Sequence, residues 1–405
     1  MIRFAVRALA AVVLVLPMAA AAQTPAWVAG WTASPQVQPA PLKALKNQTV
    51  RQRVKLAVAG SRVRLVISNE YGTRPLVIGS ASVARMAGEA VDAASIVPVT
   101  FGGAASVVAA PGAPVLSDPI ALPVTAGGEV AVSFYLPQET LPETWHRGTP
   151  AGDTAPGVTP PAAVSEVGDF TRQAALAGTV PSARLFLTRV DVLPARPAGA
   201  VVVLGTTRTD NGGWLELLRR RLASRNLAVV NASMVANPLT RPYPGGGDAG
   251  LARFDRDVLL VPGVTHVILA DAANDIGQVG TKRNGAYIVE PTAMPTVESL
   301  AAAYKQMASR AHARGVKVIV STILPFSQVP FEGFYSPEKE ALRRAFNDWI
   351  RASKDFDGIV DMDAALRDPA DPSRYRAGMD SANHFAPSEA GDRIVADAFD
   401  LKLFR

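Results

Sequence analysis

Cysteine is absent from this chain of 405 residues. Without thiols the protein can form no disulfide framework and no thiolate metal site, and it has no thiol nucleophile or cysteine for lipid attachment. Histidine is scarce, and no two of the four histidines have metal-ligand spacing, so we predict no metal site and no cofactor. The fold must depend on its hydrophobic core, which a chain of this length allows.

Long apolar runs are also scarce. Arg3 and Arg7 precede the apolar run Ala8–Ala19, and Ala20–Ala22 then supply small residues. The run is too short for a bilayer span, which needs about 20 residues. The pattern is typical of a secretory signal peptide. We predict a signal peptide over residues 1–22, and an exported, periplasmic or extracellular protein that does not span the membrane after cleavage. An uncleaved anchor is the alternative.

Charge of one sign is not concentrated anywhere. The net charge is +6, and the arginines are scattered. Arg51, Arg53, Arg62 and Arg64 alternate with apolar residues and read as solvated strand faces. A nucleic-acid partner is therefore not expected.

Residues 23–195 have the pattern of a β domain. Apolar and polar residues alternate with a period of two around residues 50–58 and 62–67, and glycine and proline separate such runs. This pattern predicts an antiparallel β-sandwich. The Pro-, Gly- and Thr-rich stretch Pro137–Pro161 is predicted to be a long loop that carries Trp145 and His146. Loops of this length are often functional.

Residues 196–405 have a different period, which begins after the predicted linker Pro194–Pro197. The predicted strands are Ala200–Leu204, Leu227–Ala232, Val264–Ala270, Val316–Ile323 and Ile359–Met362. The predicted helices are Trp214–Ser224, Ala249–Leu260, Val297–Arg314, Pro337–Ala352 and Ser388–Phe399. Strands that alternate with helices predict an α/β domain with a parallel sheet and helices on both faces.

Sites in such sheets lie at the carboxyl ends of the strands. That rule selects four segments, namely Gly205–Gly213, Ala232–Pro238, Asp271–Gly277 and Asp380–Gly391. Their order and spacing resemble the SGNH, or GDSL, hydrolase family of esterases and lipases. The stretches Leu251–Asp257 and Trp31–Pro35 resemble a secreted subgroup with an N-terminal β domain. The resemblance implies a three-layer, flavodoxin-like α/β fold of SGNH-hydrolase type after an all-β sandwich.

The same resemblance assigns roles residue by residue. In Gly205–Asp210, Thr207 falls where the family has its nucleophilic serine. Ala236 falls on the oxyanion glycine, with Asn237 beside it, and Asn274 is the retained oxyanion asparagine. In Asp380–Pro387, Asn383 falls on the catalytic aspartate and Ala386 on the catalytic histidine.

These substitutions remove most of the groups that hydrolysis needs. A hydroxyl nucleophile requires a base, and the base requires an orienting acid. Ala386 cannot move a proton, and Asn383 cannot stabilise an imidazolium as a carboxylate does. The resemblance thus indicates an inactive or impaired hydrolase whose pocket binds an acyl or carbohydrate ester.

Two alternatives stay open. The first is an active esterase or acylhydrolase with a rearranged triad of Thr207, His384 and Asp380, because histidine titrates near neutral pH. The second is a non-catalytic carbohydrate-binding or scaffold protein in which the β domain does the work. In either case Trp145 and His146 could reach over the site from the β domain. The sequence leaves the oligomeric state open.

Overall fold

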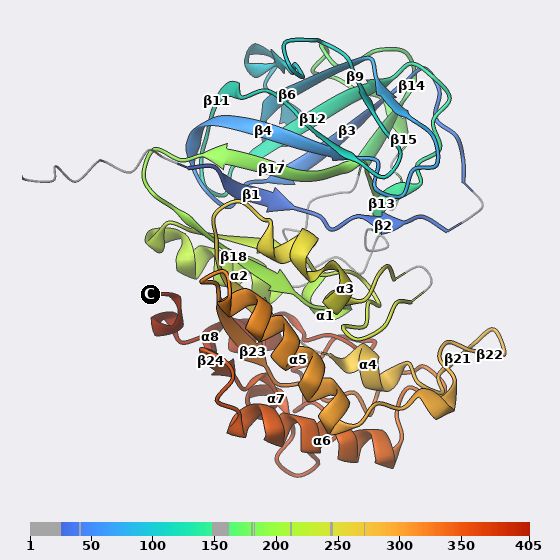
Figure 1. The fold of residues 1–405 in the computed structure, drawn as a ribbon, viewed down its shortest axis with the longest axis vertical. Coiled ribbons are helices and arrows are strands. Elements are labelled where there is room, and N and C mark those ends of the chain that lie inside the picture. The colour runs from blue at the N-terminus through green and yellow to red at the C-terminus, as the bar shows by residue number, and fades with distance from the viewer. Residues whose placement is uncertain are drawn as a thin grey trace, which may run out of the picture.

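The computed structural model describes residues 26–39, 42–147, 162–179, 181, 183–210, 213–243, 246–270 and 272–405. The predicted signal peptide lies outside these residues. The β-rich half of the chain lies above the helix-rich half in Figure 1. Within the described ranges, no helix is long and apolar enough to cross a bilayer.

Antiparallel strands build the N-terminal half. One sheet has the order β1-β17-β4-β10 with β11 also paired to β4, and a larger sheet has the order β15-β14-β3-β12-β6-β7 with β8 beside β6. Smaller sheets join β16, β13 and β2, and β5 with β9. The strands are β1 (Val28–Thr32), β2 (Gln36–Val37), β3 (Gln48–Lys55), β4 (Gly60–Ser68), β5 (Leu76–Ile78), β6 (Ser80–Ala87), β7 (Ala90–Val91), β8 (Val97–Pro98), β9 (Val107–Ala109), β10 (Pro114–Leu116), β11 (Ile120–Val124), β12 (Glu129–Leu136), β13 (Thr144–Arg147), β14 (Ala162–Val167), β15 (Gly178–Thr179), β16 (Ala183–Leu185) and β17 (Leu187–Leu193).

The period-two pattern explains how these sheets pack. Val50 and Val54 of β3 are fully buried, whereas Arg51 and Arg53 between them are partly exposed. Val50 and Val54 share one core cluster with Leu65 of β4 in the other sheet. Two sheets therefore enclose a common core, as alternating side chains require.

The prediction that Pro137–Pro161 is one long loop is wrong for the first half of this stretch. Thr144–Arg147 forms β13, which pairs with β16 on one side and β2 on the other. Trp145 and His146 thus lie on a strand, and His146 is buried. Both partner strands lie far away in the sequence, so their pairing overrides the local turn-rich composition. Residues 148–161 lie outside the described part of the chain.

The C-terminal half contains a sheet of parallel strands in the order β19-β18-β20-β23-β24. The strands are β18 (Gly199–Leu204), β19 (Leu227–Asn231), β20 (Val264–Leu269), β23 (Lys317–Ser321) and β24 (Gly358–Val360), and a small hairpin joins β21 (Lys282–Arg283) to β22 (Ala286–Tyr287). The helices are α1 (Thr207–Asp210), α2 (Gly213–Leu222), α3 (Gly250–Phe254), α4 (Ala273–Gly277), α5 (Val297–His312), α6 (Pro337–Ala352), α7 (Met362–Leu366) and α8 (Glu389–Asp397). The predicted linker falls between β17 and β18.

Alternate side chains of the central strand enter two different core clusters. Val201 and Val203 pack in the cluster that contains Leu218 of α2, whereas Val202 and Leu204 belong to the cluster that contains Tyr304 of α5. The two faces of the sheet are therefore covered by different helices, visible around β18 and β23 in Figure 1. This burial on both faces explains why the strand reads as one continuous apolar run.

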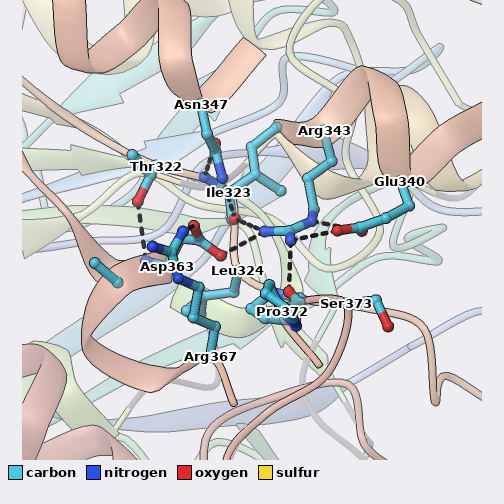
Figure 2. A network of polar contacts seen from close by, with 12 residues as sticks. Thr322, Ile323, Leu324, Glu340, Arg343, Asn347, Asp363, Arg367, Pro372 and Ser373 are labelled. Carbon is cyan, nitrogen blue, oxygen red and sulfur yellow. Dashed lines mark hydrogen bonds and ion pairs between the residues drawn. The ribbon is translucent and has the colours of Figure 1, made fainter. Parts of the chain in front are cut away.

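A buried arginine ties α6 to α7 and to the chain after β23. Arg343 is fully buried, and its guanidinium contacts Glu340 at 2.7 and 2.8 Å and Asp363 at 2.6 Å. It also donates to the carbonyl oxygens of Ile323 at 2.9 Å and Pro372 at 2.8 Å. Figure 2 shows these groups converging on the guanidinium. All five of its N–H donors are thereby used.

Strand β1 joins the two halves. Thr32 Oγ1 donates to Asn231 O at 2.7 Å, and Ser34 Oγ donates to Ala232 O at 3.2 Å. The buried Arg253 donates to Ser34 Oγ and Ala232 O as well. Asn231 and Ala232 stand at the carboxyl end of β19, so the β domain packs directly against the strand ends where a site is predicted.

Candidate functional site

Thr207 begins α1 immediately after β18. The turn before it needs glycine at position 205, because a Cβ there would lie 2.6 Å from Thr209 Oγ1 and 2.8 Å from Ala270 O. The Thr207 hydroxyl oxygen accepts a hydrogen bond from Ala236 N at 2.7 Å. The structure thus brings the nucleophile position and the oxyanion position into direct contact. Parallel strand ends that share one edge of the sheet account for this.

Ala236 occupies the left-handed region of the backbone, with φ of +59°. Gln278 Nε2 fixes this peptide by donating to Ala236 O at 2.8 Å. A Cβ in this conformation costs about 1 kcal/mol or more relative to glycine. The alanine therefore keeps the backbone shape that the family's glycine adopts easily, at the cost of local strain.

Replacing Ala236 by glycine is expected to raise the free energy of unfolding by roughly 1 kcal/mol, because the strain disappears. Urea denaturation of the Ala236→Gly variant measures the change. Ala313→Gly is the matched control, since Ala313 is exposed and has φ of −59° at the end of α5. There the same substitution is expected to lower stability. Equal changes in both variants would contradict strain at Ala236.

Asn237 is predicted to bind near the oxyanion position, but both ends of its side chain are occupied inside the protein. Its Nδ2 donates to Gly246 O and Asp248 O, each at 2.7 Å. Its Oδ1 accepts from Arg253 Nη2 at 2.9 Å and from Arg253 Nε at 3.2 Å. Asn237 is fully buried. It holds the loop that presents Ala236 and has no polar atom left for a ligand.

Asn274 lies on α4 and is 2% exposed. Its Nδ2 has no hydrogen-bond partner among the described residues. Its own carbonyl oxygen accepts from Arg241 Nη2 at 3.1 Å and from Gln278 N at 3.3 Å. Since Gln278 also holds Ala236, α4 lies close to the Thr207–Ala236 contact. A buried amide donor without a partner is costly, so this N–H₂ group is poised to bind an acceptor.

Asp275, next to Asn274, shapes the loop. Its carboxylate accepts from Leu239 N and Thr240 N, each at 2.8 Å, and from Thr240 Oγ1 at 2.5 Å. Burial raises the pKa of this carboxyl group. The hydrogen bonds of its carboxylate all come from the segment that follows Ala236, so Asp275 has a structural role in the site.

Arg208 connects α1 to the C-terminal turn that carries the acid and base positions. It is almost fully buried, its Nε donates to Phe385 O, and its guanidinium lies 5.0 Å from the centre of the Phe385 ring. Ala386 is the next residue, so the chain just before the base position is bonded to the Arg208 side chain. Asn383 Oδ1 accepts from Phe385 N at 3.1 Å and from Ser381 Oγ at 2.8 Å, and so this side chain stabilises the turn.

His384 and Asp380 form an imidazole–carboxylate couple, with His384 Nδ1 2.5 Å from Asp380 Oδ2. His384 has φ of +55°, and its side chain is 40% exposed. Within the described residues no hydrogen bond joins this couple to Thr207. His384 and Asp380 of the rearranged triad therefore contact each other, but neither is hydrogen-bonded to the Thr207 hydroxyl.

A second couple comes from the β domain: the sequence singled out His146 as a residue that could reach over the site, but not its pairing with Asp210. His146 Nε2 of β13 lies 3.3 Å from Asp210 Oδ1, at the other end of α1 from Thr207. His146 Nδ1 lies 2.8 Å from Ser34 O, and Asn231 Nδ2 donates to Asp210 Oδ1 at 2.9 Å. Trp145 Nε1 donates to Val37 O at 3.0 Å. These contacts join the two halves of the chain, and neither side chain bonds to Thr207.

The assembled site has hydrogen-bond donors, but among the described residues no imidazole or carboxylate is hydrogen-bonded to the hydroxyl. Ala236 N and Asn274 Nδ2 are donors, and Thr207 Oγ1 already accepts from one of them. Position 386 carries only a methyl group. No group of three or more His, Asp or Glu side chains in the described ranges could hold a metal ion. Such an arrangement can bind a carbonyl or an anion, whereas deprotonating Thr207 needs a base from elsewhere.

The strands and helices define an α/β domain with a parallel sheet. Residues 198–394 match the family model of the GDSL-like lipase/acylhydrolase family. The C-terminal domain therefore belongs to the GDSL-like lipase/acylhydrolase family.

Solved structures similar to this chain include a GDSL-like lipase from Bacteroides thetaiotaomicron, with 17% identity, 51% of this chain and 87% of that chain covered, and a TM-score of 0.38. An alpha/beta hydrolase from the metagenome of Lake Arreo shares 19% identity, with 51% and 95% covered and a TM-score of 0.38. A family two carbohydrate esterase from Clostridium thermocellum in complex with cellohexaose shares 12% identity, with 93% of each chain covered and a TM-score of 0.34. No curated protein matches the chain significantly.

Proposed function

We propose that the protein is an exported member of this family that binds an acyl or carbohydrate ester and hydrolyses it poorly or not at all. One observation carries the proposal. The Thr207 hydroxyl oxygen accepts from Ala236 N, and no imidazole or carboxylate contacts it among the described residues. A threonine also has a stiff χ1 and a methyl group that crowds an approaching carbonyl. Loss of base and acid costs many orders of magnitude in rate.

What remains of the site supports binding. Asn274 Nδ2 is a buried donor with no partner in the described part of the chain. An ester carbonyl that accepts from this group would satisfy it, and a neutral site does not repel such a ligand. The ester is therefore bound through contacts that elsewhere in the family serve the oxyanion, as the resemblance implies.

Purified protein is expected to hydrolyse p-nitrophenyl acetate and butyrate no faster than its Thr207→Ala variant. Saturation-transfer NMR with ethyl butyrate measures binding in the same preparation. Asn274→Asp should abolish the NMR signal because a carboxylate cannot donate, while Asn284→Asp, in the exposed turn of the β21–β22 hairpin, should leave it unchanged. Turnover that Thr207→Ala removes would overturn the proposal.

A second function is favoured by one observation, the 2.5 Å contact between His384 and Asp380. If binding of an ester brings His384 into hydrogen-bond contact with Thr207, the protein is an esterase with a rearranged triad. Turnover lost in both Thr207→Ala and His384→Gln would establish it. Turnover lost only in Thr207→Ala would exclude His384 as the base.

A further inference from the structure

The outer face of the larger β sheet contains a hollow of about 570 Å³. Its lining includes Arg51, Arg53, the Glu89 carboxylate, and apolar side chains such as Met86, Val91, Ala131, Ala163 and Leu176. This volume is in the range of small-molecule sites, roughly 300–1,000 Å³. The hollow belongs to the β domain, so the inference is independent of the function proposed for the C-terminal domain.

Strand register explains why space is left there. Arg53 stands opposite Ala131, and Arg51 stands opposite both Ser133 and Ala163. Residues opposite one another on neighbouring strands share one face of a sheet. The core face at this place is filled by Val50 and Val54, whereas on the outer face the neighbouring strands present the small side chains of Ala131, Ala163 and Ser133. The two arginines therefore border a shallow apolar floor.

The segment after β14 closes one side of the hollow and is held there by Arg51. The guanidinium donates to the carbonyl oxygens of Gln173 at 2.5 Å, Ala174 at 2.6 Å and Phe170 at 3.1 Å. Its Nε donates to Ser133 Oγ at 2.8 Å. These four bonds use four of the five guanidinium N–H donors, and one donor on Nη1 has no partner among the described residues.

The charges of the two arginines are compensated differently. Arg53 is paired with Glu129 and, at 2.6 Å, with Glu89. All the contacts of Arg51 are to neutral oxygens, and no carboxylate contacts it among the described residues. Burial lowers the pKa of Arg51, as expected for a cation without a counter-ion. An anion placed in the hollow would supply that counter-ion.

We propose that this hollow binds a small amphipathic anion, namely a carboxylate with a hydrocarbon chain of intermediate length. The carboxylate faces Arg51 and accepts from the N–H left on Nη1. The hydrocarbon chain lies on Ala131 and Ala163 and against Leu176. An apolar lining beside a guanidinium without an anionic partner favours this class over neutral sugars, for which the lining offers no aromatic side chain.

Isothermal titration calorimetry of the full mature chain with octanoate tests the site. Octanoate is expected to bind with 1:1 stoichiometry, and octan-1-ol and acetate at least roughly tenfold more weakly, because each lacks one half of the interaction. Ala131→Met and Ala163→Met fill the floor and should each weaken octanoate binding by a similar factor. Ala121→Met is the matched control, since Ala121 is exposed on β11 in the other sheet.

Binding at the C-terminal site is distinguished by Asn274→Asp, which should leave octanoate affinity unchanged. Circular dichroism verifies that each variant is folded. Octanoate affinity that stays the same in both folded floor variants would overturn the proposal. Octan-1-ol binding as tight as octanoate would overturn the role of Arg51.

Discussion

Replacing Arg343 by methionine is expected to lower the free energy of unfolding by about 3–5 kcal/mol. The side chain is fully buried, and its removal leaves Glu340 and Asp363 without their shared cation. It also leaves the carbonyl oxygens of Ile323 and Pro372 without a donor. A buried carboxylate that loses its counter-ion is more costly than the net contribution of the intact pair, so the loss is large. Urea denaturation monitored by tryptophan fluorescence measures it.

The neighbouring residue provides the control. Arg344 is exposed on the same helix, so Arg344→Met is expected to change stability by no more than about 0.5 kcal/mol. Arg343→Lys keeps the charge but cannot make five directed bonds, and it should fall between the two. A loss below about 1 kcal/mol in Arg343→Met would show that Glu340 and Asp363 are satisfied by water or by Arg351 and Arg367, which also contact Asp363.

The elements with strong local signals could be predicted from the sequence. Ser336 caps α6 by accepting from Lys339 N, and Pro337 begins the helix, so the predicted range Pro337–Ala352 is confirmed. Helix α5 begins at Val297 as predicted, after the Thr296 cap. By contrast, the single helix predicted over Ala249–Leu260 is divided into α3 and a π-helical turn at Asp255–Leu259. Arg253 and Asp257 are buried side by side there, and no local spacing rule anticipates such packing.

Strands that depend on distant partners were harder to predict. Strand β13 has four residues and exists because β2 and β16 pair with it from far along the chain. Residues 76–84, a largely apolar stretch, belong to two strands, β5 and β6, with Gly79 between them. A Cβ on Gly79 would approach the Tyr135 ring to 2.9 Å, so the break follows from a tertiary contact.

The same distinction applies to the site. The contact between Thr207 and Ala236 agrees with the rule that parallel strand ends converge, which selected both segments, while the resemblance singled out the two residues within them. The pairing of His146 with Asp210 crosses from one half of the chain to the other, and nothing in either local segment signals it. Arg208 could have been noticed as a charged residue between buried strand-end residues, because a buried arginine must find acceptors.

Restoring the family pattern with Thr207→Ser, Asn383→Asp and Ala386→His together is expected to produce esterase activity. We expect kcat/KM for p-nitrophenyl butyrate to rise at least roughly 10³-fold above the level of the unmodified protein, because a complete triad contributes about 10⁶ in other hydrolases. Arg208 of α1 donates to the backbone oxygen of Phe385, and the expectation that position 386 reaches position 207 rests on this link between α1 and the C-terminal turn. Asn274 Nδ2 has no partner among the described residues and is available as an oxyanion donor, whereas Ala236 N becomes available when it releases the hydroxyl of residue 207.

The single variants should gain little, since nucleophile, base and acid act as a unit. The matched control is Asn383→Asp with Ala386→His and Thr207→Ala, which has the base and acid but no hydroxyl. Activity in the triple variant and none in this control would place residues 207, 383 and 386 at one catalytic centre. If the triple variant folds and remains at the control level, the turn that Asn383 stabilises through Ser381 and Phe385 keeps positions 383 and 386 out of reach of residue 207. In that case the domain departs from an active hydrolase in the geometry of its C-terminal turn as well as in its side chains.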